Sequence, residues 1–248
     1  MLGLVLPNSK SVLLKSFTFK NCNELYGIRD NKSAVIEFLD GLFITAGLNI
    51  IEKFYCLLHL RDLCVGNIIE LRDYNFDVLR IQEELQEIID IKKTIKFDSN
   101  SITFNYPKNF TCSSMYNDSF IETILLDGEV INYNKLSSEE RNLIFNYLPE
   151  SIQKEIKNFY KKHINRLKIE FTIKDKELVL SLDSGQCVEF LTTMLVPMNP
   201  GTYRDYIFIL SKRIKDVSFI QQSTFLDIKD YMDLYLKESK ENKSDLNN

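Results

Sequence analysis

Cysteine and histidine come nearest to forming a reactive site in this chain. Cys56, His59 and Cys64 fall within one short segment, and on a helix Cys56 and His59 would be neighbours because they are three positions apart. A histidine beside a thiol can act as a general base and convert the thiol into a nucleophile. This spacing allows one alternative function, a small intracellular cysteine-dependent enzyme. A helix-face histidine at the edge of the core explains the same spacing more simply.

The five cysteines are odd in number and widely spaced, at positions 22, 56, 64, 112 and 187. They form no C-x-x-C pair, and the only histidines are His59 and His163. A structural zinc site needs four Cys or His ligands, usually supplied as closely spaced pairs. We therefore predict buried free thiols in a reducing compartment and no metal site. His163 follows two lysines near the end of a predicted helix, where a cation would complement the helix dipole.

Other sequence patterns that carry chemistry are missing. No G-x-S-x-G, P-loop or G-x-G-x-x-G pattern occurs, and eight glycines leave little room for a phosphate-binding loop. The carboxylate pairs Glu83-Glu84 and Glu139-Glu140 lie in helix starts or turns, where solvated side chains are expected. We predict no catalytic, cofactor-binding or metal-binding residue, no cofactor and no enzyme activity.

The balance of charge argues against nucleic-acid binding. The 248 residues include 31 basic and 35 acidic side chains, which gives a net charge of −4 with both signs interleaved. Without a basic excess, general binding to a phosphate backbone is not expected. A DNA-binding accessory protein is a second alternative, because a helix pair over 139–162 would carry Lys154, Lys157, Lys161 and Lys162. We predict a solvated helix face there and no nucleic-acid partner.

Membrane association is not expected either. The first seven residues lack the basic and apolar regions of a signal peptide. Charges interrupt every apolar stretch before the ~20 residues that a membrane span needs. At 44% hydrophobic residues the chain has enough apolar material for a packed core. We therefore expect a soluble intracellular protein.

The first quarter of the chain predicts strands and then helices. Residues 2–19 are typical of extended segments, and Asn21 or Asn23 would cap the short helix that follows. A stronger helix begins near residue 33. Asn49 is expected to cap a third helix, which has a wide apolar stripe. The charged residues that lie off this stripe are Glu52, Lys53 and Arg61.

The middle of the chain predicts short strands and hairpins. Asn67–Arg72 and Val78–Ile81 are typical of strands, whereas Glu83–Ile91 fits a helix or a strand. Asp98-Ser99-Asn100 and Asp127-Gly128 are turn sequences and predict two β-hairpins.

Helices dominate the later part. Ser137 and Glu140 form a capping-box pattern at the first of two consecutive helices, and Pro149 suits the first position of the second. The remaining predicted elements are strands over 167–173 and 178–182, a short helix over 184–194, and helices over 203–213 and 227–236.

This order of elements indicates the α+β class, with N-terminal strands plus a helical bundle, central β-hairpins and a helical C-terminal region. We predict four parts. They are an N-terminal strand and helical lobe (1–66), a central α+β region with β-hairpins and a helix pair (67–182), C-terminal helices (183–236) and a disordered tail (237–248).

Three stretches follow the pattern of one known protein family. They are the strand–turn–strand run over 6–20, the helix over 54–66 with its Leu60-Arg61 and Val65-Gly66 pairs, and the strand Ile102–Pro107. These stretches resemble the baseplate hub proteins of T4-type contractile-tailed bacteriophages, a family of hub subunits and hub assembly proteins. The resemblance is collinear over most of residues 4–191 and weaker to about 236, and Lys15 replaces the arginine usual in the family.

The resemblance implies a non-enzymatic phage tail protein that takes part in baseplate hub assembly. It would act as a hub subunit or as an assembly chaperone for hub and tape-measure proteins. Its partners would be other phage tail proteins. It would work in the host cytoplasm during assembly, and as a subunit it would remain in the tail baseplate of the virion.

Two elements are expected to touch these partners. The helices of residues 33–65 have an apolar stripe wider than one core contact requires, formed by Leu39, Phe43, Phe54 and Leu58. The helices of residues 203–236 end in an amphipathic helix, with Ile228, Tyr231, Met232 and Tyr235 on one side. Packing of this terminal helix on its own domain is the alternative.

Overall fold

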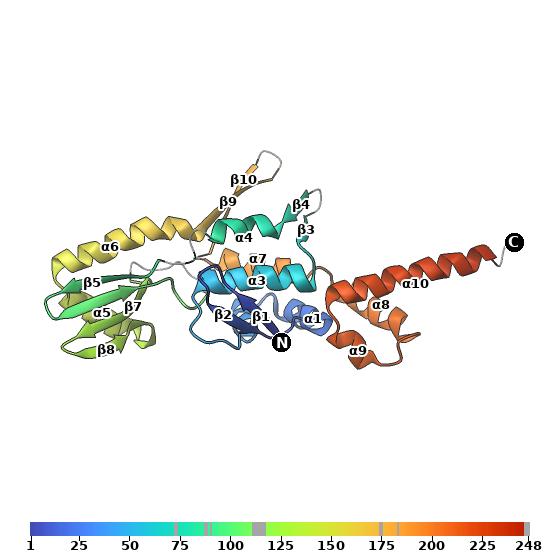
Figure 1. Cartoon of the computed structure of the whole chain (residues 1–248), viewed down its shortest axis with the longest axis horizontal. Coiled ribbons are helices and arrows are strands. Elements are labelled where there is room, and N and C mark those ends of the chain that lie inside the picture. Colours follow the sequence, from blue (N-terminus) through green and yellow to red (C-terminus); the bar gives the residue numbers. More distant parts are fainter. Residues whose placement is uncertain are drawn as a thin grey trace.

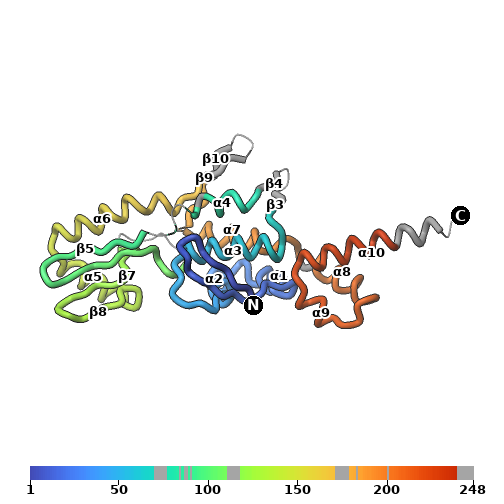
Figure 2. Tube along the Cα trace, in the orientation of Figure 1, coloured from blue at the N-terminus to red at the C-terminus, as the bar shows by residue number. Residues whose placement is uncertain are grey.

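The computed structural model describes residues 1–71, 74–86, 89, 91–110, 118–173, 176–182 and 184–245. Helices and small antiparallel sheets alternate in blocks, which confirms the α+β class. The molecule is elongated (Figure 1). A four-stranded sheet and its helices lie at one end, a helical centre in the middle, and three C-terminal helices at the other end (Figure 2).

The N-terminal region combines one hairpin with three helices. Its elements are β1 (Leu2–Val5), β2 (Ser11–Leu14), α1 (Phe19–Ile28), α2 (Lys32–Asp40) and α3 (Ile50–Cys64). Thr18 caps α1 and forms a capping box with Asn21, so the extended segment expected to reach Phe19 is wrong, and Asn21 is the third residue of the helix. The second helix ends at Asp40, before Phe43.

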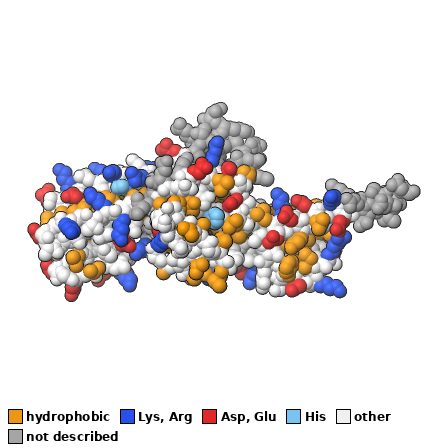
Figure 3. Space-filling model, viewed as in Figure 1, with side chains coloured by type: hydrophobic (Ala, Val, Ile, Leu, Met, Phe, Trp, Pro, Cys, Tyr) orange, Lys and Arg blue, Asp and Glu red, His pale blue; other side chains and the backbone are white. Residues whose placement is uncertain are grey.

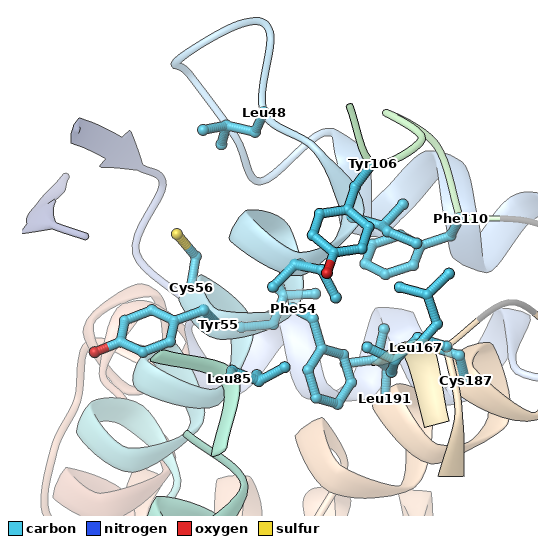
Figure 4. Close-up of a cluster of buried hydrophobic side chains, with 14 of the residues drawn as sticks. Leu48, Phe54, Tyr55, Cys56, Leu85, Tyr106, Phe110, Leu167, Cys187 and Leu191 are labelled. Carbon is cyan, nitrogen blue, oxygen red and sulfur yellow. The ribbon is translucent and has the colours of Figure 1, made fainter. Parts of the chain in front are cut away.

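Helix α3 lies at the centre of the molecule. Asn49 caps it as predicted, and Glu52 completes the capping box. Phe54 of this helix lies in one apolar cluster with Tyr106 and Leu191, which come from distant parts of the chain (Figure 4). Residues next to α3 in space are therefore mostly remote from it in sequence.

The segment after α3 differs in part from the prediction. Strand β3 (Ile68–Leu71) pairs antiparallel with β4 (Tyr74–Asp77), and helix α4 (Val78–Gln86) follows directly. Val78–Ile81 is thus helical and not a strand. The Asp77 carboxylate accepts a hydrogen bond from the Leu79 amide at 2.9 Å, which favours a helix start. Arg72, predicted to end the first strand, lies outside the described residues.

The central sheet confirms both predicted hairpins. Its order is β5 (Lys93–Phe97), β6 (Asn100–Phe104), β7 (Ile121–Leu126) and β8 (Glu129–Asn132), with every neighbouring pair antiparallel. Asp98, Asp127 and Gly128 have φ values of 48°, 49° and 87°, the left-handed conformation that tight hairpin turns require.

Two helices follow the sheet. After the short 3-10 helix η1 (Tyr133–Lys135) come α5 (Ser138–Tyr147) and α6 (Glu150–Ile164), and the capping box of Ser137 and Glu140 is confirmed. Pro149 caps α6 and lies just before its first residue. The ring of Phe159 on α6 stacks on Phe104 of the sheet at a centroid distance of 4.4 Å, which holds this helix against the strands.

The rest of the chain is a hairpin followed by helices. The elements are η2 (Asn165–Leu167), β9 (Lys168–Ile173), β10 (Lys176–Ser181), α7 (Gly185–Leu195), α8 (Pro200–Ser211), α9 (Val217–Gln222) and α10 (Phe225–Asp245). Helix α9 was not predicted. Helix α10 continues to Asp245, which corrects the disordered tail predicted from residue 237, because lysine and glutamate favour helix and no Gly or Pro interrupts the segment. Residues 246–248 lie outside the described part.

Two clusters of buried apolar residues stabilise the molecule. The larger one extends from Leu6 to Leu195 and joins residues of the N-terminal, central and α7 segments. The smaller one contains Phe19, Tyr203, Leu210, Ile220, Ile228 and Met232. The larger core includes residues on both sides of two predicted boundaries, 66/67 and 182/183. The division of the chain into four parts stays a prediction.

Candidate functional site

The thiol of Cys56 is fully buried within α3. Burial, followed by the nearby carboxylate of Glu52, raises its pKa to about 12. The thiol therefore stays protonated near neutral pH, and a protonated thiol is a poor nucleophile. His59 is half-buried on the same helix, and within the described residues no hydrogen bond joins it to Cys56 or Cys64. The geometry does not support the activated thiol of the enzyme alternative.

The other described cysteines have the same character. Cys22, Cys64 and Cys187 are buried thiols, as predicted, and burial raises the pKa of Cys22 to about 12. Cys112 lies outside the described residues. In the described part of the chain no group of three or more His, Cys, Asp or Glu side chains is arranged to hold a metal ion.

Three charged residues of α3 are buried although they lie off its apolar stripe. Glu52, Lys53 and Arg61 are 4%, 9% and 4% exposed. A charge that is removed from water needs an internal partner. Lys53 forms an ion pair with Asp40 at 2.7 Å.

Glu52 connects α3 to the N-terminal hairpin. Its carboxylate accepts hydrogen bonds from the Asn49 amide at 2.9 Å, the Asn8 side chain at 3.1 Å and the Lys10 ammonium at 3.0 Å. The ammonium group also donates to the Gly47 carbonyl at 3.2 Å. Three segments of the chain therefore meet at this one carboxylate, which gives Glu52 a structural role.

A second polar chain connects α3 to the sheet. The Asn49 side chain donates to Asn105 at 3.4 Å, and Asn105 donates to the Glu122 carboxylate at 3.4 Å. Lys108 forms an ion pair with Glu122 at 3.0 Å. Burial opposes ionisation of Glu122, but the hydrogen bond and charge of Lys108 outweigh it and hold the pKa of this carboxyl below its usual value.

Arg61 is the least satisfied of the buried charges. It donates to the Ile68 carbonyl at 2.7 Å, while its Nε and Nη1 groups find no hydrogen-bond partner within the described chain. Burial lowers its pKa to about 10. Arg61 thus ties the end of α3 to the start of β3, with no ligand group of opposite charge arranged beside it to form a site.

The lysines of the DNA-binding alternative lie on the outer face of α6. Lys154, Lys157, Lys161 and Lys162 are exposed, whereas Ile152, Ile156 and Phe159 are buried. Glu150 and Glu155 interrupt this basic face. In a helix-turn-helix the recognition helix packs on a second helix, whereas α6 packs on the sheet. The structure therefore gives the DNA-binding alternative no support.

His163 is buried against Phe159, with 4.3 Å between the ring centroids. Burial, and then the positive charges of Arg166, Lys162 and Lys93, lower its pKa to about 4. The prediction that His163 is a cation at the end of α6 is therefore wrong, because its imidazole is neutral near pH 7.

The two predicted contact elements are largely parts of the core. Leu39, Phe54 and Leu58 are fully buried and Phe43 is half-buried, so the stripe of residues 33–65 is not available to a partner. Ile228 and Met232 pack into the smaller core, and Tyr231 and Tyr235 are half-buried beside them. The predicted face of the C-terminal helix thus packs on its own lobe.

Other apolar side chains of the C-terminal lobe face solvent. Phe208 on α8 is 65% exposed, and Leu234 and Leu236 on α10 are 56% and 48% exposed. Val217 and Phe219 on α9 are also exposed. Figure 3 shows apolar side chains gathered over this lobe. Sequence periodicity missed them because α10 carries apolar residues on both sides and the more regular set is the buried one.

The N-terminal hairpin and the segment that follows α2 form a second exposed apolar region. Val5 of β1, Leu13 of β2 and Ile44 are 65%, 48% and 45% exposed. The Leu13 carbonyl accepts the Ile44 amide at 2.9 Å, so these residues lie side by side. Within the described residues, no helix combines the length and apolar character required to cross a membrane.

Comparison with known families gives one match. The model of the family described as T4 bacteriophage base plate protein matches residues 3–180, which include the N-terminal region, the central sheet and the helix pair. No curated protein and no solved structure matches the chain. The matched region ends before the C-terminal helices.

Proposed function

The chain belongs to the T4 bacteriophage base plate protein family, since the match covers well over half of it, and we propose that it is a non-enzymatic tail protein of baseplate hub assembly. It acts as a hub subunit or as an assembly chaperone for hub and tape-measure proteins. The family match over residues 3–180 is the observation that carries this proposal.

The interior of the molecule supports a role in contact rather than in chemistry. The described thiols are buried, and burial raises the pKa of Cys56 to about 12. The buried charges Glu52, Lys53 and Arg61 are used to connect segments of the fold. Polar groups committed to internal hydrogen bonds stabilise a rigid body.

The C-terminal lobe supplies the surface for partners. Phe208, Phe219 and Leu234 expose apolar side chains to solvent, which does not stabilise a monomer. Aromatic side chains often supply much of the binding free energy at protein interfaces. The partners we propose are other phage tail proteins, reached in the host cytoplasm during assembly. A hub subunit would then remain in the virion tail.

Affinity purification from infected cells tests this proposal. A tagged chain should recover hub or tape-measure proteins, and the double variant Phe208→Ser and Leu234→Ser should recover fewer of them. Arg204→Ser with Lys229→Ser is the matched control, because both side chains are exposed on the same two helices. Recovery of no tail protein by the unchanged chain would overturn the proposal. Mass spectrometry of purified virions then separates the two roles, because a chaperone is present in the lysate and absent from the particle.

Thiol reactivity tests the absence of cysteine chemistry. Because Cys112 lies outside the described residues, the test uses Cys112→Ser. The folded variant should react with an aromatic disulfide reagent many times more slowly than the same chain in denaturant. A fast-reacting Cys56 in the folded protein, slowed by His59→Gln, would contradict the non-enzymatic assignment.

A further inference from the structure

Strand β1 has one open edge. It pairs with β2 in the register Leu2↔Leu14, Gly3↔Leu13, Leu4↔Val12 and Val5↔Ser11. The Leu6 amide donates to the Lys10 carbonyl, and the Leu13 carbonyl accepts from Ile44 on the other side of the hairpin. Hydrogen-bonded pairs alternate along an antiparallel ladder. The backbone groups of Gly3 and Val5 therefore point away from β2, and in the described chain they have no partner.

This open edge lacks the usual protection against pairing. Natural edge strands carry charges, bulges or a covering segment. Residues 1–9 contain no charged side chain, and β1 is a regular strand without a bulge. Val5 and Leu13 expose apolar side chains on the same face of the hairpin. A regular and apolar edge without charged side chains is suited to pairing with another strand.

Gly3 gives this edge a specific shape. A Cβ atom added at Gly3 would meet only Leu13 Cδ2, at an ordinary contact distance of 3.8 Å. The fold of the single chain therefore has room for a side chain there, while glycine in a strand weakens the strand. The missing side chain leaves a gap in the exposed face, with Leu13 on one side and the free edge on the other.

We propose that β1 pairs antiparallel with β1 of a second copy of this chain, about a two-fold axis through Leu4. This register places Gly3 opposite the partner's Val5 and Val5 opposite the partner's Gly3. Both are residues whose N–H and C=O groups point outward, so each pair exchanges two backbone hydrogen bonds. The result is one continuous sheet in the order β2–β1–β1–β2.

The side chains fit this register. Opposite residues of an antiparallel pair lie on the same face, so the isopropyl group of the partner's Val5 fills the gap over Gly3 and reaches Leu13. The same contact is repeated across the two-fold axis, as a symmetric interface requires. The large exposed residue and the missing side chain are thus complementary to each other, and this favours a second copy over an unrelated strand.

Sedimentation of the purified full chain over a concentration series tests the proposal. A monomer–dimer equilibrium is expected, and Val5→Lys should shift it to monomer by placing two charges in the new sheet. Val179→Lys is the matched control, because Val179 is also an exposed strand valine, 50% exposed on β10. A monomer at every concentration, or a dimer insensitive to Val5→Lys, would overturn the proposal.

Gly3→Val distinguishes pairing from a purely structural effect. Valine fits the single chain and favours strand, so the monomer should be at least as stable. In the dimer it would lie opposite the partner's Val5 as a favourable cross-strand pair of β-branched residues, so the dimer should persist, and loss of the dimer in this variant would contradict the register. Amide exchange gives a direct measurement, since the Gly3 and Val5 amides should be protected only in the dimer. Fast exchange of both amides in the dimer would contradict the register. A monomer in which Val5→Lys abolishes tail-protein binding would assign this edge to another protein's strand.

Discussion

Helices α3 and α10 were both expected to present an apolar stripe to a partner, and they have opposite environments. Helix α3 is buried along most of its length, and even Glu52, Lys53 and Arg61 are buried. Of the described residues of α10, Ile228 and Met232 are buried, and Leu234 and Leu236 face solvent. An apolar stripe therefore shows that a helix packs against other parts of a protein. How many elements of the same chain surround the helix decides which apolar side chains stay exposed to a partner.

The charges of the two helices differ in the same way. Glu52 of α3 accepts hydrogen bonds from three residues inside the molecule, Asn8, Lys10 and Asn49. Glu238 of α10 forms an exposed ion pair with Arg213. Buried pairs cannot be broken without leaving a charge unpaired, whereas exposed pairs contribute little.

Phe19 joins the two regions. It belongs to α1 of the N-terminal region, yet its ring stacks on Tyr203 at 4.4 Å within the smaller core. Its amide donates to the Ser223 carbonyl at 2.7 Å. Phe19 is therefore one of the contacts that attach the C-terminal lobe to the family-matched region, and Phe225 of the lobe likewise packs against both cores.

The largest expected effect is that of Phe54→Ala. Phe54 is fully buried in the larger core, so its removal should lower the free energy of unfolding by about 3–5 kcal/mol, measured by chemical denaturation. The control Phe208→Ala, on a 65% exposed side chain, should change it by less than about 0.5 kcal/mol. Equal losses of unfolding free energy in the two variants would contradict the difference in burial between α3 and the C-terminal lobe.

Phe19→Ala should release the C-terminal lobe. We expect a loss of about 3 kcal/mol, because the ring is fully buried and contacts the lobe on its stacked face. Limited proteolysis should then cut between α7 and α8 while the matched region stays intact. Resistance of that connection to protease in the variant would show that other contacts hold the lobe in place.

Glu52→Ala sharpens the comparison of charges. It leaves Lys10, Asn8 and the Asn49 amide without their acceptor, and we expect a loss of about 2 kcal/mol. Glu238→Ala, which removes the exposed pair with Arg213, should change stability by less than about 0.5 kcal/mol. The opposite order would mean that the Glu52 network contributes no net stability.

Acid should weaken the matched region and not the lobe. The folded pKa of His163 is about 4, below the value near 6.5 of an unfolded histidine, so the unfolded chain takes up the proton first. The stabilising contribution is fully present above pH ~6.5 and is lost as the pH falls towards ~4. Allowing for solvent screening, the loss at pH 5 is about 1 kcal/mol. Residues 200–245 contain no histidine.

Denaturation of the unchanged chain and of His163→Gln at pH 7.5 and pH 5 measures how much His163 contributes to the pH dependence of stability. The difference between the two pH values should be smaller in the variant. His59→Gln serves as the control and should keep the full difference. An unchanged pH dependence in His163→Gln would show that His163 is not the group responsible.

The smallest expected change in stability is that of Leu234→Ser. The side chain is 56% exposed, so the free energy of unfolding should stay within about 0.5 kcal/mol of the unchanged chain. Recovery of tail-protein partners should nevertheless fall, while the exposed Lys229→Ser on the same helix should leave it unchanged. Loss of stability without loss of binding would assign Leu234 to the lobe's own packing.

Local chemistry allowed much of the fold to be predicted. Asp127-Gly128 places its hairpin because few other residues adopt the left-handed backbone that the turn needs. Asn49 and Ser137 begin their helices because each accepts a backbone amide at the helix start. These interactions span a few residues, so the sequence alone specifies them. The same holds for the buried thiols, since isolated cysteines pack as apolar side chains.

The tertiary structure decided which faces are hidden. His163 is neutral because tertiary packing buries its imidazole, which local spacing does not reveal. The outward edge at Gly3 and Val5 depends on the pairing register of the hairpin. Burial depends on segments brought together from far along the chain, and a stripe of apolar residues cannot distinguish a core neighbour from a partner that has yet to bind.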